Sequence, residues 1–226
     1  GKSPREPVRD VAFVGVEFRD AALTWLEPHA APSGGDWALP RTAAVFLENV
    51  ENVGFRECLF ERVDGNALMV SGHARGVVVE RSEFAWVGAT AVVLWGRTSP
   101  CLDEACSRQL PPHPDVEGPD GRGAAQPRGS RLSGNVFREL GVFVKQSAAV
   151  FSALAGLTQI EGNVMFNAPR ALINFNDGFL GADVVRSNLL ANAVRESADH
   201  GPINMWSRVP FIREAFKELG EKRDTV

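Results

Sequence analysis

The chain has 226 residues, and 24 lysine and arginine residues against 28 aspartate and glutamate residues give it a net charge of −4 at pH 7. This balance lacks the basic footprint of a nucleic-acid-binding protein, and no stretch approaches the roughly 20 apolar residues of a membrane span. The length allows a substantial core in one or two domains. We therefore expect neither a nucleic-acid nor a membrane partner.

The N-terminal segment, residues 1–7, is charged and lacks the apolar core of a signal peptide. The chain then enters a strand-like run over residues 11–18 and closes with a charged tail. An excised part of a longer repeat array would begin and end in this way. We therefore expect the chain to be a fragment of a longer protein.

Short strand-like segments that end in a large apolar residue recur along the chain. Their end residues, spaced by 42, 24, 53, 28 and 25 positions, are Phe18, Phe60, Phe84, Phe137, Met165 and Leu190. Spacings near 25 residues indicate single turns, or coils, of a solenoid. The two longer spacings fit either one coil with an insertion or two coils.

A second run of four to seven residues follows most of these segments after a short turn. These runs are rich in Val, Ile, Leu and Phe and are bounded by Gly, Asn, Asp or Arg, which is typical of strands. They cover residues 67–71, 91–95, 149–152, 171–177 and 201–207.

Two proline- and glycine-rich segments, residues 26–41 and 97–131, interrupt the coils and are predicted to be loop insertions. The second contains Cys101 and Cys106, with His113 nearby. No further Cys or His pair completes a zinc site, so a local disulfide is the favoured interpretation. A disulfide would favour an extracytoplasmic protein.

The most informative segment is written twice, since residues 171–177 are echoed by residues 201–207, 30 positions later. This spacing predicts two strands stacked directly over one another. Side chains alternate along a strand, so half of each copy faces inwards. The inward pairs are Ile173 with Ile203 and Phe175 with Met205, and the outward pairs are Asn174 with Asn204 and Asn176 with Trp206.

Helical periodicity appears only over residues 211–219, which predicts a short C-terminal helix. The remaining pattern predicts an all-β, right-handed parallel β-helix, a solenoid in which residues 1–226 form a single domain. One coil cannot bury its apolar face alone, whereas stacked coils share a core. Asn135, Asn163 and Asn188 recur after Gly or Ser at one place in their coils, so we expect stacked turn asparagines there.

Titratable side chains gather beside the repeated segment. Asp177 ends the first copy, and Glu196, Asp199 and His200 lie in the turn before the second. Coils lie about 4.8 Å apart, so equivalent positions on adjacent coils can reach one sugar ring. A glycosidase needs one protonated and one ionised carboxyl group, and proximity separates their pKa values. We predict Asp177 and Asp199 as the leading catalytic residues, with Glu196 or His200 in support.

Polar neighbours supply contacts for a sugar, because amides donate to and accept from hydroxyl groups and a tryptophan ring can stack on a sugar face. The predicted substrate-binding residues are Asn174, Asn176, Arg195, Asn204, Trp206 and Arg208. Structural interpretations stay open for the same positions, namely a turn pair, a solvated ion pair, edge packing and an amide ladder. No metal site is predicted.

The coil pattern resembles the pectin-lyase-like right-handed β-helix superfamily. The stretch from Gly162 to Arg208, with residues 173–178 and 195–204, resembles a subgroup of right-handed β-helix region proteins. The resemblance implies a secreted protein related to polysaccharide-active enzymes, chiefly glycoside hydrolases. Members of this subgroup often carry an acidic residue where this chain has Ser207 and continue into further coils, so we expect further coils in the parent chain.

Three functions follow from these observations. The first is a glycoside hydrolase-like protein that acts on an extracellular polysaccharide or oligosaccharide through paired carboxylates, with no cofactor. The second is a polysaccharide lyase or epimerase, in which Arg170, Arg195 and Arg208, or a Ca²⁺ ion, would neutralise a uronate. The third is a non-catalytic glycan-binding or structural module, which Ser207 favours.

Overall fold

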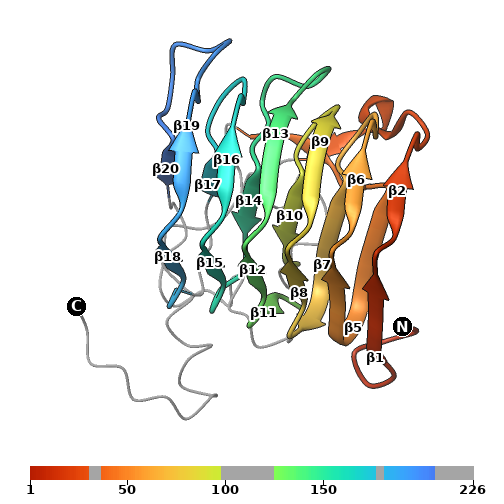
Figure 1. Cartoon of the computed structure of the whole chain (residues 1–226). Helices are drawn as coiled ribbons and strands as arrows, with labels where there is room; N and C mark the ends of the chain where they lie inside the picture. The colour runs from red at the N-terminus through yellow and green to blue at the C-terminus, as the bar shows by residue number, and fades with distance from the viewer. Residues whose placement is uncertain (31–36, 98–124, 177–180, 207–226) are drawn as a thin grey trace, which may run out of the picture.

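The computed structural model describes residues 1–30, 37–97, 125–176 and 181–206. It confirms the predicted all-β parallel β-helix. In Figure 1 the coils stack side by side along one axis, from β1 (Val8–Val14) near the N-terminus to β20 (Ile203–Trp206) at the other end.

Each coil contributes strands to rows that run along the axis of the β-helix. Row A consists of the first half of β5 (Val45–Arg56), β7 (Leu68–Arg75), β10 (Val92–Trp95), β14 (Val150–Ala153), β17 (Ile173–Asn176) and β20. Row B consists of β1, the second half of β5, β8 (Val78–Glu80), β12 (Arg131–Ser133), β15 (Gln159–Glu161) and β18 (Val184–Arg186). Row C consists of β2 (Glu17–Arg19), β6 (Leu59–Glu61), β9 (Glu83–Val87), β13 (Val136–Leu140), β16 (Val164–Phe166) and β19 (Leu189–Ala191).

The long strand β5 joins rows A and B, because it pairs with β7 along its first part and with β8 along its last. Rows A and B therefore belong to one 12-stranded sheet, to which β11 (Pro127–Arg128) adds beside β7. Row C is a separate 6-stranded sheet. All pairings within both sheets are parallel, so the strands of each row run in the same direction in every coil.

The register of row C shows which spacings are single coils. Phe18 pairs with Phe60, Phe60 with Phe84, and Phe84 with Phe137. The spacings of 42 and 53 residues are therefore each one coil with an insertion. The three ring pairs stack with centroids 4.7, 4.5 and 4.9 Å apart, which gives the core a continuous aromatic column.

An asparagine ladder holds the corner between rows B and C. Asn163 Oδ1 accepts hydrogen bonds from the backbone N–H and the side-chain amide of Asn135, at 2.9 and 3.0 Å. Asn188 does the same for Asn163, whose amide also donates to the Leu132 carbonyl. The predicted stacked asparagines are therefore confirmed, although the left-handed backbone falls on the residue before each of them.

The first insertion packs onto the coils. Within residues 26–41, β3 (His29–Ala30) pairs antiparallel with β4 (Leu39–Pro40), and a short 3-10 helix, η1 (Thr24–Leu26), precedes them. Trp37 and Leu39 are buried. The segment predicted as a loop therefore contributes apolar surface to the fold.

The second insertion ends earlier than predicted. Of residues 97–131, the structure describes residue 97 and the part from 125 onwards, which rejoins the sheet at β11, and Arg131 already belongs to β12. Cys101, Cys106 and His113 lie outside the described residues, so the disulfide stays a prediction.

The predicted C-terminal helix over residues 211–219 also lies outside the described residues. Where the chain is described it contains no α-helix, and so none long and apolar enough to cross a membrane. The assignment of residues 1–226 to a single domain stays a prediction.

Replacing Asn163 by Ala should destabilise the fold by about 3 kcal/mol, because the Asn135 amides and the Leu132 carbonyl lose a buried partner. The matched control is Gln159→Ala, an exposed amide on the neighbouring strand β15, which should change stability by less than about 0.5 kcal/mol. Urea unfolding followed by circular dichroism measures both. Equal losses for the two variants would contradict the role given to the ladder.

Candidate functional site

The two copies of the repeated segment stack as β17 and β20 in the predicted register. The pairs are Ile173 with Ile203, Asn174 with Asn204, Phe175 with Met205, and Asn176 with Trp206. The expectation that Ile203 and Met205 fill the interior is wrong, since they are 46% and 66% exposed. They lie on the last described strand of row A, where no described coil covers them.

The outward amides of β17 are not on an open surface, contrary to expectation. Asn174 and Asn176 are fully buried. Asn204 Nδ2 donates to Asn174 Oδ1 at 2.6 Å, so these two form the amide ladder that was the structural interpretation. Among the described residues, the Asn174 Nδ2 atom and both polar side-chain atoms of Asn176 have no hydrogen-bond partner. Because an unpaired buried polar group costs about 1–3 kcal/mol, these atoms mark a place for a further polar contact.

The outward face of row A changes from apolar to polar along the axis. Phe46, Met69, Val93 and Phe151 occupy the position that Asn174 and Asn204 take on the last two described coils. The buried ring of Trp37, from the first insertion, lies 5.2 Å from the Phe151 ring. Trp37 therefore lies at the border between the two parts of this face.

The turns that lead into β17 and β20 bring Arg170, Asp199 and His200 together. Arg170 Nη2 forms an ion pair with Asp199 Oδ2. Its Nε and Nη2 atoms lie 3.1 Å from Nδ1 and Nε2 of His200. The His200 ring is nearly parallel to that of Trp37, with centroids 6.0 Å apart, and the guanidinium carbon of Arg170 lies 5.6 Å from the Trp37 ring. We call these four residues the Arg170 cluster.

Within the Arg170 cluster, only the carboxylate reaches far into solvent. The Asp199 side chain is 68% exposed, against 17% for Arg170 and 7% for His200. Partial burial raises the pKa of Asp199, but the charges of His200 and Arg170 and their hydrogen bonds outweigh it and hold that pKa below its usual value. Asp199 is therefore an ionised carboxylate at neutral pH, held in place by cationic and aromatic neighbours.

Glu196 and Arg195 belong to other contacts. Glu196 forms an ion pair with Lys145 at 3.0 Å, and Arg195 pairs with Glu139 at 3.3 Å. The Lys145 and Glu196 side chains are each about half exposed, and such pairs contribute at most about 1 kcal/mol. The solvated-pair interpretation therefore fits Glu196 and Arg195 better than a direct part in the site.

Two predicted site residues, Asp177 and Arg208, lie outside the described residues, as does Ser207. The pairing of Asp177 with Asp199 therefore stays a prediction. Asn204 follows His200 by four residues and is half-buried, and Trp206 is 53% exposed; both belong to β20.

A polar network centred on Ser71 of β7 occupies the other end of the outward face. The Arg41 guanidinium lies 3.7 Å above the Trp95 ring and donates to Ser71 Oγ. Ser71 donates to Glu48 Oε1 at 2.8 Å, and Arg97 Nε donates to the same oxygen at 3.0 Å. Burial, with the charge of Arg97, lowers the pKa of Arg41 to about 9. These contacts fasten the end of the first insertion to row A.

Among residues 1–30, 37–97, 125–176 and 181–206, no group of three or more His, Cys, Asp or Glu side chains could hold an ion. The Ca²⁺ ion of the lyase alternative stays a prediction.

Comparison with known proteins supports the fold and leaves the function open. A solved structure described as a glycoside hydrolase is similar to this chain, with a TM-score of 0.67 and 16% sequence identity. The likeness covers 90% of this chain but 38% of that one. At this identity it shows a shared fold alone. No protein-family model and no curated protein matches the chain.

Asp183 is a carboxylate that sequence reasoning missed. It lies in the turn from row A to row B, where its Oδ1 accepts a hydrogen bond from the Thr158 backbone N–H at 2.8 Å. Burial raises the pKa of Asp183 to about 6, against the opposing effect of the Thr158 hydrogen bonds. No periodic signal marks this position, because its burial depends on how the turn packs.

Asp183 should make the protein less stable as pH rises. In the folded state the Asp183 carboxyl keeps its proton up to about pH 6, whereas in the unfolded chain it releases the proton near pH 3.8. The stabilisation by Asp183 is therefore complete below pH 4 and is lost as the pH rises through 6. The loss is at most about 3 kcal/mol. Asp183→Asn keeps the acceptor for Thr158 and removes the titration. Urea unfolding between pH 4 and 7 should therefore show a free energy of unfolding that depends less on pH in Asp183→Asn than in the unchanged protein. A loss of stability in this variant at pH 7 would contradict this account.

Proposed function

We propose that this chain is part of a carbohydrate-active β-helix protein of the glycoside hydrolase type, acting on a polysaccharide or oligosaccharide. The observation that carries the proposal is the Arg170 cluster, which presents the ionised Asp199 carboxylate in the turn next to β20. The exposed ring of Trp206 and the half-buried amide of Asn204 follow on that strand. The solved structure that shares the fold of this chain is described as a glycoside hydrolase.

The electrostatics of the cluster divide the roles between the two predicted carboxyl groups. Asp199 is ionised beside Arg170, so it suits the nucleophile or general base and not the acid. The proton donor must then be another group, and we propose Asp177, which follows Asn176 at the end of the first copy. His200 contacts both Arg170 and Asp199 and serves as a positioning residue.

Asp199→Asn and Asp177→Asn should each lower kcat at least about 100-fold in the full-length protein that contains this chain. The assay is release of reducing ends from neutral and acidic polysaccharides. The matched control is Glu57→Gln, an exposed carboxylate paired with Arg81 at a distant corner, which should leave kcat unchanged. Full activity of Asp199→Asn would remove this residue from the mechanism, and full activity of Asp177→Asn would remove the proposed acid.

Trp206→Ala should raise KM about tenfold and leave kcat nearly unchanged, because stacking on a sugar acts on ground state and transition state alike. Trp86→Ala is the matched control, since Trp86 is a tryptophan of similar exposure on row C, at 49% against 53%. Initial-rate kinetics on the same substrate compare the two. An equal effect of both substitutions would argue against Trp206 as a sugar contact.

Two other functions use the same residues. A lyase or epimerase needs a cation to neutralise a uronate, but Arg170 is only 17% exposed and is engaged by Asp199 and His200, which makes this alternative weaker. A double bond absorbing in the ultraviolet in the product would establish it. A non-catalytic glycan-binding module is favoured by the exposed Trp206 and by Ser207, and binding without turnover would establish it.

We also propose that the parent protein is extracellular and continues into further coils. The chain spans 38% of the length of its structural neighbour, and Ile203 and Met205 leave an apolar surface on the last described coil. A further coil would bury these side chains and pair the edge of β20.

A further inference from the structure

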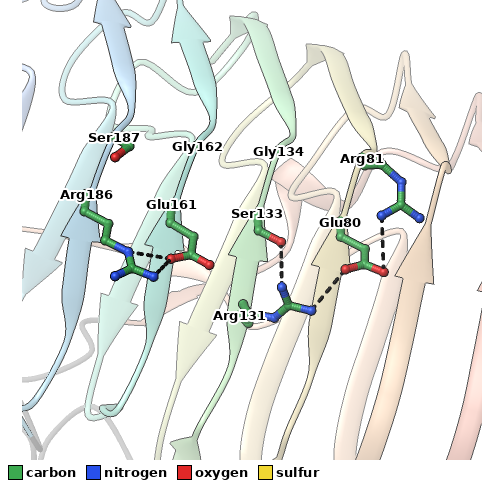
Figure 2. Close-up of a pocket in the computed structure, with 9 residues that line it drawn as sticks. All are labelled: Glu80, Arg81, Arg131, Ser133, Gly134, Glu161, Gly162, Arg186 and Ser187. Carbon is green, nitrogen blue, oxygen red and sulfur yellow. Dashed lines mark hydrogen bonds and ion pairs between the residues drawn. The ribbon is translucent and has the colours of Figure 1, made fainter.

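A groove of about 430 Å³ lies at the corner between rows B and C, on different strands from the Arg170 cluster. It crosses four successive coils, those of β8, β12, β15 and β18. Figure 2 shows its charged side chains projecting from neighbouring strands toward one another. No residue of this groove takes part in the proposed function.

Arginines and glutamates line the groove, and the arginines are the more exposed of the two. Arg131 pairs with Glu80 at 3.0 Å, and Arg186 pairs with Glu161 at 2.6 Å, while Arg81 lies 3.7 Å from Glu80. Arg81 and Arg186 are 58% and 67% exposed, whereas Glu80 and Glu161 are 12% and 22% exposed. The lining therefore carries three arginines against two glutamates, with the arginines the more exposed, although Arg81 also pairs with the exposed Glu57 at 3.1 Å.

Two glycines keep the centre of the groove open. Arg81 and Ser187 show that a side chain is compatible with the left-handed backbone at this corner, with φ of 47° and 55°. A Cβ atom added to Gly134 or Gly162 would meet its nearest neighbour at 3.8 or 3.9 Å, an ordinary contact distance. Close packing therefore does not require glycine at these two positions. Without side chains, the two glycines leave an open floor between the arginines.

The centre of the floor offers hydrogen bonds. Ser133 lies between Glu80 and Glu161 in the register of row B, and its Oγ accepts a hydrogen bond from Arg131 Nη1 at 3.2 Å. Arg131 and Arg186 belong to strands two coils apart, a spacing of about 10 Å. Arginines at both ends of a floor that carries a hydroxyl group, two glycines and the arginine-paired Glu161 suit an extended chain that carries anionic groups at intervals.

We propose that this groove is a second glycan-binding site, which holds a segment of an acidic polysaccharide with its anionic groups on Arg131 and Arg186. Hydroxyl groups of the bound segment would lie over Ser133 and the glycine floor. The carbohydrate class rests on the proposed function, and the arginines add the preference for acidic chains. Both glutamates are engaged by arginines, so the groove binds the polysaccharide and does not cleave it.

The test is isothermal titration calorimetry of the chain with three hexasaccharides, namely a galacturonate, a sulfated uronate-containing glycan and a neutral xylan fragment. The acidic hexasaccharides should bind, and their affinity should fall as the salt concentration rises. Their relative affinities distinguish carboxylate from sulfate as the anionic group. Arg186→Gln and Arg131→Gln should each weaken binding about tenfold. The control Arg138→Gln removes an arginine of row C that pairs with Glu83 at 2.6 Å outside the groove, and it should bind normally.

Equal binding of the neutral and acidic hexasaccharides would overturn the proposal, as would equal affinities for Arg186→Gln and Arg138→Gln. If an arginine variant fails to fold, Ser133→Leu, which fills the floor, should abolish binding in its place. Asp199→Asn should bind the acidic hexasaccharide normally. Absence of turnover in a protein that still binds in the groove would count against the proposed hydrolase function alone. Turnover without groove binding would count against the second glycan-binding site alone.

Discussion

The register between successive coils is the constraint on which the structure depends. Parallel pairing holds successive coils at a fixed offset from β2 to β19 in row C and from β5 to β20 in row A, apart from one register shift between Glu48 and Val50 of β5. The asparagine ladder and the aromatic column reinforce this offset from the corner and from the core. A slip of one residue would turn every inward side chain outwards, so the same contacts that stabilise the fold also fix where Asn174, Arg170 and Arg186 lie.

The fold was predictable because its signal is repeated. Six apolar end residues, with three of their five spacings near 25, indicate coils, and the repeated segment even gives the register of β17 and β20. Extending that repeat by one position places Arg170 over His200, so the 30-residue offset also carried the central contact of the candidate site. Insertion lengths alone could not distinguish one coil from two, and pairing in row C decides that question.

The surroundings of the site were less predictable, because they depend on contacts without a period. Nothing near Trp37 in the sequence indicates that it would contact Phe151 and His200, and nothing near Asn174 indicates that its outward amide would be buried. Glu196 and Asp199 are close in sequence but take partners on different segments. Local spacing therefore identified the region of the site, whereas the role of each carboxylate depended on partners distant in the sequence.

The contact between Trp37 and His200 has a consequence for how the protein folds. Most coil contacts join neighbouring coils and can form in the order in which the chain is synthesised. Trp37, by contrast, meets its histidine only after more than half of the chain has followed it. The Arg170 cluster can therefore be complete only once the coil of β20 has stacked on that of β17 and the first insertion has packed onto row A.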